Sequence, residues 1–236
     1  MPEGSSAAEV GKGISGANPT GRRARERYGV LLGAIIIAFA VQGIADPAPW
    51  EQIFMTTLLG VTLLLAFWAG DAKPIVTRPA IVIVVLVIVA SVVEAANGDV
   101  DAGATRVANA LLVGLAPPMI VIGVLRSLRA RQAVTLEAVF GVLCVYILVG
   151  MFFGYLYGAI DHLGGHPFFT GDQSTTVARC LYFSFASLTT VGYGDLTART
   201  NLGHTLSVSE ALLGQIYLVT VVSLIVANLG RSRSVR

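Results

Sequence analysis

The sequence predicts an all-α membrane protein with six transmembrane helices and one shorter helix that enters the membrane and turns back. Composition supports this class, because 55% of the 236 residues are hydrophobic and only 13% are charged, whereas soluble domains carry roughly 25% charged residues. Mean hydropathy is +0.75. The apolar residues gather into runs near the roughly 20 residues that a helix needs to cross a bilayer. These runs cover residues 28–44, 53–69, 79–93, 107–125, 134–160 and 202–229.

The first 24 residues are rich in Gly, Ser, Ala and charge, and we expect them to form a disordered cytoplasmic tail. A basic cluster follows, formed by Arg22, Arg23, Arg25 and Arg27. Such a cluster suits anionic lipid, but a signal that orients the first helix is the favoured interpretation. The next apolar run is long for a signal peptide, and the residues after it make a poor cleavage site. A first transmembrane helix is therefore expected at residues 28–44.

Prolines and cysteines give smaller indications along the middle of the chain. Pro79 suits the first turn of the third helix. Pro117 and Pro118 lie inside the fourth run and should break or kink that helix. Cys144 and Cys180 lie in unrelated apolar segments, so we expect two small packing residues and no disulfide framework.

A shorter segment, residues 175–188, lies between the fifth and sixth runs. As a helix it is roughly 20 Å long, which is too short to cross the membrane. A re-entrant helix surrounded by protein is the expected solution. Ser174 or Thr175 suits its N-cap. Its C-terminal end should point into the membrane, where the partial negative charge of a helix end favours a cation.

The charges agree with six crossings and a cytoplasmic N-terminus. Arginine and lysine gather in the loops that would be inside, and acidic residues gather in the loops that would be outside. The inner positions hold Lys73, Arg78, Arg126, Arg129, Arg131, Arg231, Arg233 and Arg236. The outer positions hold Asp46, Glu51, Glu94, Asp99, Asp101, Asp161 and Asp172, with Arg106, Arg179 and Arg199 as the basic exceptions. We expect a multi-pass protein of the plasma (inner) membrane with both termini cytoplasmic, ending in a short tail at residues 231–236.

A seven-residue run follows the short helix and reads Thr189, Thr190, Val191, Gly192, Tyr193, Gly194 and Asp195. Glycines at alternate positions free the backbone to turn successive carbonyls toward one axis. Rings of such carbonyls, contributed by four copies of a loop, can replace the hydration shell of K⁺. Thr190 adds a side-chain oxygen at the inner end.

This run closely resembles the selectivity filter of the potassium channels. The order of outer helix, re-entrant helix, filter and inner helix over residues 132–230 also matches that family. The resemblance implies a homotetramer in a lipid bilayer that conducts K⁺ and needs no other cofactor. It places the permeant K⁺ at Thr190, Val191, Gly192 and Tyr193.

Other pore residues have roles that the resemblance suggests. Tyr182 and Phe183 stand where many family members carry two tryptophans, so they either brace the filter or simply pack. Tyr182 has a polar tip that can bond Asp195 or a filter tyrosine, and Phe183 does not. Some members carry a glutamate at the position of Ala186. We therefore expect no glutamate-controlled filter gate.

Two residues of the sixth helix stand out. Glu210 is an acid inside a membrane span, which is costly and indicates function. A hydrogen bond to the backbone of the re-entrant helix, which would hold the filter, is favoured over a proton-sensing gate. Gly214 fits the place where several family members bend the inner helix. It is equally suited to close helix packing.

The first four helices, residues 25–131, resemble a voltage-sensing unit in position but lack its chemistry. Such a unit needs charges at every third residue within the field, each contributing about 2.3 kcal/mol per 100 mV. The fourth run has none, since Arg126, Arg129 and Arg131 fall at or beyond its inner end. Weak or absent voltage gating is the prediction.

No catalytic, phosphate-binding or nucleic-acid signature is recognised, and we expect a protein that is not an enzyme. His162 and His166 have the spacing of metal ligands on a helix, but the intervening glycines favour a solvated loop. A potassium-selective channel is the leading hypothesis. The alternatives are a subunit of a cation transporter and a non-conducting or weakly selective membrane protein.

Overall fold

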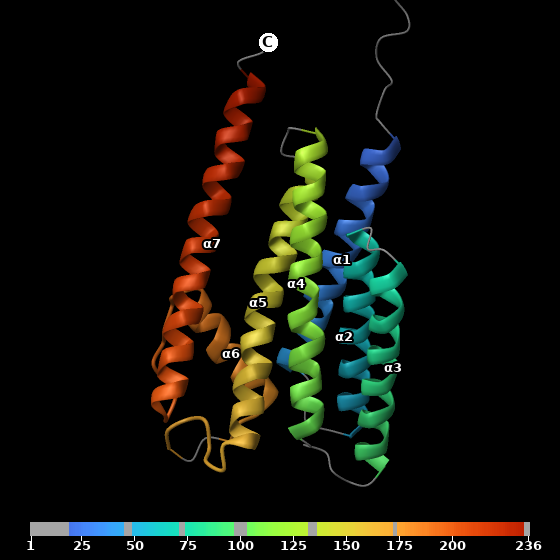
Figure 1. Ribbon diagram of the computed structural model, residues 1–236. Helices are drawn as coiled ribbons and strands as arrows, with labels where there is room; N and C mark the ends of the chain where they lie inside the picture. Colours follow the sequence, from blue (N-terminus) through green and yellow to red (C-terminus); the bar gives the residue numbers. More distant parts are fainter. Residues whose placement is uncertain are drawn as a thin grey trace, which may run out of the picture.

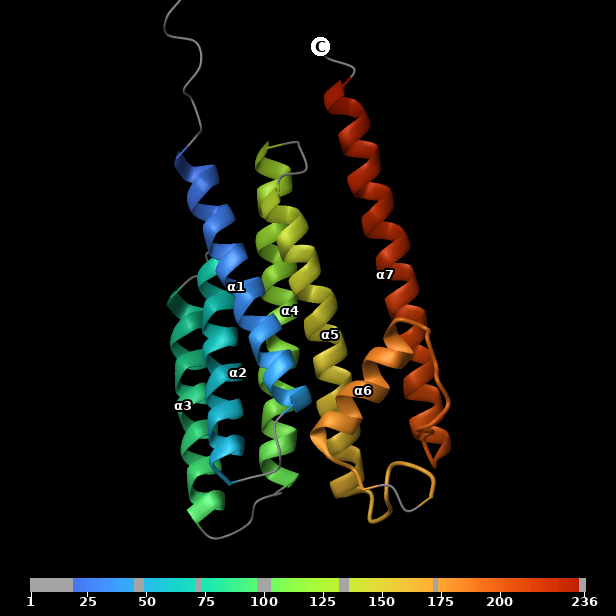
Figure 2. The same ribbon diagram turned by 180° about the vertical axis from the view of Figure 1, so that it is seen from behind.

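The structure is a computed structural model that describes residues 19–44, 49–70, 74–96, 103–131, 136–171 and 174–233. In these residues the chain is helical, with no strand beyond one isolated bridge between Phe169 and Ala198. Figures 1 and 2 show long helices standing side by side and one short helix, α6, near one end of the bundle. The helices are α1 (Pro19–Ile44), α2 (Pro49–Ala69), α3 (Pro74–Ala96), α4 (Gly103–Arg131), α5 (Leu136–Leu163), α6 (Val177–Leu188) and α7 (Asn201–Arg233).

The all-helical class and the order of the helices are as the sequence predicts, and the apolar helices are those of a membrane protein. Among the described residues, four helices contain a stretch long and apolar enough to cross a bilayer. These stretches are Glu26–Gly43, Pro74–Glu94, Val107–Val124 and Ala138–Leu163. The apolar part of α2, Ile53–Ala69, is shorter. Crossings by α2 and α7 therefore stay predictions.

Helix α1 begins at Pro19, inside the tail that was expected to lack structure through residue 24. Proline suits a first helical turn, and the arginines that follow are good helix formers, so the apolar helix extends backward through them. Arg27 also contacts the end of α2. Its guanidinium lies 4.6 Å from the centre of the Trp68 ring and donates to the Trp68 carbonyl at 3.4 Å.

The prolines disturb the helices less than expected. Helix α3 begins at Pro74, so Pro74 and not Pro79 occupies the first turn. Helix α4 continues through Pro117 and Pro118, so a break at these residues is wrong, and a kink there stays a prediction. A proline removes one backbone hydrogen bond, and neighbouring helices in a membrane protein can hold the helix across that gap. Figure 1 shows α4 lying alongside α5, which supplies such support.

The core lies between α1, α2, α4 and α5: α1 and α4 pack directly on α5, and α2 packs on α1 and α4. Its fully buried side chains include Leu31, Ile35, Leu63, Leu112, Ile120 and Leu148. Helix α3 lies at the edge of the bundle (Figure 1) and exposes a nearly continuous apolar surface. Such a surface suits contact with lipid chains.

Glycines let α1, α2 and α4 approach one another closely. A Cβ atom at Gly123 of α4 would lie 2.5 Å from the Tyr28 hydroxyl of α1 and 2.8 Å from the Gly70 Cα after α2. Three buried polar residues lie about 14 residues, or roughly 21 Å, along the helices from this close contact. They are Gln42 of α1, Thr56 of α2 and Asn109 of α4.

These three polar residues lie at one level of the four-helix interior. Among the described residues, no hydrogen-bond partner is found for either amide atom of Gln42, for Thr56 Oγ1 or for Asn109 Oδ1. A buried polar atom without a partner costs about 1–3 kcal/mol. These buried polar atoms therefore lower the stability of the packing between the first four helices.

Candidate functional site

The segment between α5 and α7 enters the bundle and leaves it on the same side. Figure 2 shows α6 rising from the end of α5 into the body of the molecule, and the chain then returning along α7. Helix α6 has 12 residues, which gives it a length of roughly 18 Å. The structure thus has the re-entrant arrangement that the sequence predicts for this segment.

Helix α6 is capped by Thr176, and not by Ser174 or Thr175 as predicted. Thr176 has extended backbone angles, and its Oγ1 accepts the Arg179 N–H at 3.3 Å. The other two residues have different partners. Thr175 Oγ1 donates to Asp161 Oδ1 at 2.5 Å, and Ser174 Oγ accepts from the Arg179 guanidinium at 2.7 Å. Both contacts fix the outer end of α6 against its surroundings.

The backbone after α6 alternates between two conformations. Thr190, Gly192 and Gly194 have φ values of +58°, +53° and +81°, whereas φ is not positive at Val191 and Tyr193. Alternation of right- and left-handed residues places successive N–H groups on one side of the chain. The carbonyl oxygens of the same peptide units then lie on the other side. The run therefore presents a row of carbonyls in one direction.

Hydrogen bonds show which side faces α6. The N–H groups of Thr189, Thr190 and Gly192 donate to the carbonyls of Phe185, Ser187 and Ala186 at 3.0, 2.9 and 3.1 Å. The first two bonds close the last turn of α6, and the third turns the Gly192 N–H toward α6. Side chains of the run are exposed in the single chain, with Val191 at 53% and Tyr193 at 71%.

The side chains of Tyr182 and Phe183 point in different directions. Tyr182 contacts the run after α6, whereas Phe183 packs in the interior. The Tyr182 ring stacks on the Tyr193 ring with centroids 6.0 Å apart and planes 8° apart. Its side chain also hydrogen-bonds Asp195. Tyr182 is therefore in contact with two residues of the run.

Phe183 packs behind the run instead. Its ring centroid lies 5.3 Å from that of Tyr157, 5.9 Å from Phe168 and 5.4 Å from Phe169. Together with Phe153 these rings form an aromatic cluster between α5, α6 and the loop that joins them. Phe183 is a packing residue in this arrangement.

Glu210 is fully buried on α7 and joins three helices. Tyr157 of α5 donates to its Oε2 at 2.6 Å, and the Ser184 hydroxyl of α6 contacts its Oε1. Ser184 also lies within hydrogen-bonding distance of the Gly150 carbonyl, at 2.6 Å. The prediction of a bond to the backbone of α6 is therefore wrong in detail, because Glu210 bonds the Ser184 side chain and also reaches α5.

Helix α7 also touches the inner end of the run. A Cβ atom at Gly214 would lie 2.2 Å from the Leu188 carbonyl oxygen, so Gly214 lets α7 pack against the end of α6. This geometry favours the packing interpretation of Gly214, and its role as a hinge stays a prediction. The next residue, Gln215, donates from Nε2 to Thr190 Oγ1 at 2.9 Å. We did not predict this bond, although a lone amide beside a glycine in an apolar run is a usable signal.

Close packing of α6 on α5 depends on two glycines spaced four residues apart. A Cβ at Gly150 would lie 2.7 Å from the Phe185 ring, and one at Gly154 would lie 2.7 Å from the Leu181 side chain. The Phe185 ring also meets Phe39 of α1, with centroids 4.6 Å apart. The spacing of these glycines is visible in the sequence, but we did not single it out.

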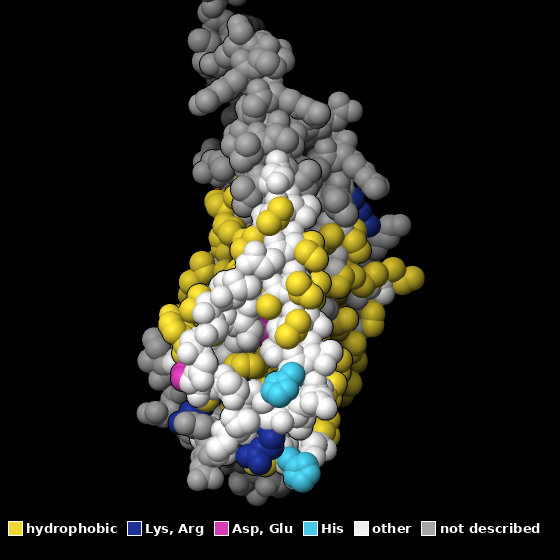
Figure 3. Space-filling model, turned by 90° about the vertical axis from the view of Figure 1, so that its left-hand side faces the viewer, with side chains coloured by type: hydrophobic (Ala, Val, Ile, Leu, Met, Phe, Trp, Pro, Cys, Tyr) yellow, Lys and Arg dark blue, Asp and Glu magenta, His cyan; other side chains and the backbone are white. Residues whose placement is uncertain are grey.

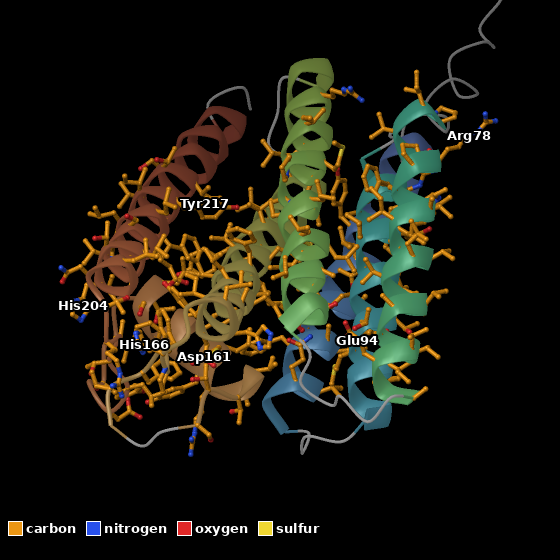
Figure 4. The ribbon with its side chains drawn as sticks, turned by 60° about the horizontal axis from the view of Figure 1, so that its bottom comes forward. Arg78, Glu94, Asp161, His166, His204 and Tyr217 are labelled. Atoms are coloured by element: carbon orange, nitrogen blue, oxygen red, sulfur yellow. The ribbon has the colours of Figure 1, made fainter. Side chains whose placement is uncertain are left out.

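Both histidines are exposed at one end of the site, but His162 lies in the last turn of α5, so the predicted loop is wrong for His162, whereas His166 lies in the loop after the helix. Figure 4 shows Asp161 and His166 near each other at this end, where they line a hollow together with Ser174. In the part of the chain that the structure describes, no group of three or more His, Cys, Asp or Glu side chains is placed to hold a metal.

The outward face of α7 is apolar. Figure 3 views the molecule from this side and shows several hydrophobic side chains among other atoms over the middle of the described part. Its exposed large side chains are Val208, Leu212, Leu213, Ile216 and Val219. This surface continues from the exposed side chains of the run after α6, so one continuous face is left uncovered in the single chain.

Residues 142–231 match a family model described as an ion channel. The match begins within α5, covers α6 and the run after it, and ends within α7. It supports an ion channel pore in this part of the chain and leaves the first four helices unassigned. Comparison with curated proteins and with solved structures found no match.

Proposed function

We propose that the chain is one subunit of a homotetrameric potassium channel that conducts K⁺ passively and selectively. The alternating backbone of Thr190, Gly192 and Gly194, with the Gly192 N–H turned toward α6, is the observation that carries this proposal. Carbonyl oxygens held in one direction can replace the hydration shell of K⁺. The K⁺ sites would lie at the oxygens of Thr190, Val191, Gly192 and Tyr193.

Four copies are needed because one chain supplies only one side of such a site. The uncovered face of the run and of α7 includes Val191 and Tyr193. Apolar and aromatic side chains exposed to this extent suit burial against further copies around a fourfold axis. The C-terminal end of each α6 would then contribute partial negative charge to a shared cavity.

The first four helices support weak or absent voltage gating. Only four residues, 132–135, separate α4 from α5. Helix α4 lies along α5 of the same chain (Figure 1). The arginine at position 126 also lies near the end of α4, away from the middle of the span.

The proposed location is a plasma (inner) membrane, with the chain crossing six times and both termini cytoplasmic. Helix α1 begins and α7 ends at the same end of the bundle, and α6 lies toward the opposite end (Figures 1 and 2). With cytoplasmic termini, the proposed filter would lie toward the outer face. The partners expected from this arrangement are lipid, K⁺ and three further copies of the chain.

Ion flux from purified protein in liposomes tests the proposal. We expect K⁺ flux well above Na⁺ flux in the wild type, and loss of K⁺ flux in Gly192→Ala, because alanine is strained at φ +53°. Gly165→Ala is a matched control, since Gly165 also has a positive φ of +65° and open space around it but lies outside the run.

Each alternative predicts a different result. Equal fluxes of K⁺ and Na⁺ would indicate a weakly selective protein. No flux across a range of pH and membrane tension would indicate a non-conducting one. A native mass of one chain in mild detergent would contradict the tetramer and favour a subunit of a transporter.

A further inference from the structure

We propose that Gln215 is a positioning residue for ion selection, which holds the side chain of Thr190 at the inner end of the filter. The inference rests on the proposed function and goes beyond it by assigning a role to a residue of α7. It follows from three observations: the backbone of Thr190, the bond that its hydroxyl receives, and the close approach of α7 at Gly214.

Thr190 has a backbone conformation that is unfavourable for threonine. Among the described residues it is the one non-glycine residue with a positive φ, +58°. This region is unfavourable for residues that carry a Cβ, and more so for a β-branched residue. The surroundings must therefore fix it. Its N–H donates to the Ser187 carbonyl at 2.9 Å, and its Oγ1 accepts from Gln215 Nε2 at 2.9 Å.

The bond from Gln215 determines what the Thr190 hydroxyl offers to an ion. A hydroxyl has one hydrogen to donate and two lone pairs that accept. A cation needs a lone pair, and a freely rotating hydroxyl can turn its hydrogen toward the ion instead. The amide of Gln215 occupies one lone pair and excludes the rotamer in which the hydrogen points toward the amide, which reduces the staggered orientations of the hydroxyl from three to two. The bond also fixes the position of Oγ1, so that the second lone pair is directed to the ion in one of these two orientations.

Gly214 makes this bond possible. Its missing side chain lets α7 approach the Leu188 carbonyl, where any Cβ would lie 2.2 Å from the oxygen. The adjacent Gln215 is thereby brought within reach of Thr190. Gly214 and Gln215 therefore act together: the glycine allows α7 to lie close to the end of α6, and the glutamine makes the hydrogen bond to Thr190.

The test measures the K⁺/Na⁺ permeability ratio from reversal potentials of reconstituted channels. Gln215→Met keeps the length of the side chain and removes the donor. Loss of one ordinary hydrogen bond corresponds to about fivefold in an equilibrium, so we expect the ratio to fall by about fivefold or more. Leu111→Met, at an exposed position of α4 outside the run and α7, is a volume-conserving control that should keep the wild-type ratio.

A double-mutant cycle identifies the hydroxyl as the partner. Thr190→Val should lower the ratio, and adding Gln215→Met to it should lower the ratio no further. Thr190→Ser keeps a hydroxyl and should retain the dependence on Gln215, which provides a readout if Thr190→Val does not assemble. Gly214→Ala should lower the ratio like Gln215→Met. A change confined to open probability would instead assign Gly214 to gating.

A wild-type channel that selects K⁺ while Gln215→Met keeps its full ratio would overturn the inference and leave the proposed function intact. A wild type that does not select K⁺ would overturn the proposed function itself. Additive effects in the cycle would also contradict the inference, because they would show that Gln215 acts on selection without the Thr190 hydroxyl.

Discussion

Two substitutions of the buried Glu210 distinguish what the shape of its side chain contributes to stability from what its charge contributes. Glu210→Ala removes both oxygens, which leaves the Tyr157 hydroxyl without the acceptor that now lies 2.6 Å away. Ser184 retains the Gly150 carbonyl at 2.6 Å. Glu210→Gln keeps the size and shape of the side chain. Its amide oxygen can accept from Tyr157, and its amide N–H can donate to Ser184.

The expected magnitudes follow from these contacts. An orphaned buried hydroxyl costs about 1–3 kcal/mol, and a cavity in a fully buried site adds a comparable amount. We therefore expect Glu210→Ala to lower the free energy of unfolding by about 3 kcal/mol. For a chain of this size that corresponds to a fall in Tm of about 6–12 °C. Glu210→Gln should stay within about 1 kcal/mol of the wild type.

Thermal unfolding of the detergent-solubilised protein, followed by tryptophan fluorescence, measures both variants. The K⁺/Na⁺ permeability ratio provides a second readout, because Glu210 joins α7 to the helix that carries the filter. The reasoning would be refuted if Glu210→Gln were as unstable as Glu210→Ala, since the negative charge would then be essential. Equal stability of Glu210→Ala and the wild type would show that the bonds contribute little.

Three further predictions follow from close packing and from buried polar groups. Gly154→Ala should weaken the α5–α6 contact, because its Cβ would lie 2.7 Å from the Leu181 side chain, and the expected fall in stability of about 1–3 kcal/mol is measurable as a lower Tm. Tyr182→Phe keeps the ring but loses the bond to Asp195, so K⁺ current should decline faster during prolonged recording, and an unchanged time course would contradict the role of that bond. Thr56→Val removes a buried hydroxyl without a partner in the described residues and should raise the free energy of unfolding by about 1 kcal/mol. A lower Tm would instead indicate that the hydroxyl has a hydrogen-bond partner, for instance water.

The sequence predicts the helices and the unusual backbone at positions 192 and 194 well, because both signals are local, whereas the role of this run as a filter stays a prediction. Runs of apolar residues mark the spans, and the alternating glycines at 192 and 194 mark backbone that only glycine adopts easily. The positive φ of Thr190 is not visible in this way, since threonine gives no sign of it.

Contacts between helices are harder to predict from this sequence. A soluble helix shows its buried side by the spacing of apolar residues, but membrane helices are apolar on all sides. Glu210 was therefore recognised as buried and important, while its partner Tyr157, 53 residues away, was not. The bond from Gln215 to Thr190 depends in the same way on the depth and rotation of α7, which no local pattern records.

The contact between Phe39 and Phe185 bears on how far the chain can be divided. By sequence the pore half looks self-sufficient, with a clear boundary near residue 132. Yet the ring of Phe185 lies between Gly150 of α5 and Phe39 of α1, and the run proposed as a filter begins four residues later at Thr189. A fragment cut at that boundary would leave one side of this ring without its protein neighbour. The packing of α6 is thus completed by the first helix of the chain, so the boundary in the sequence is not a boundary in the packing.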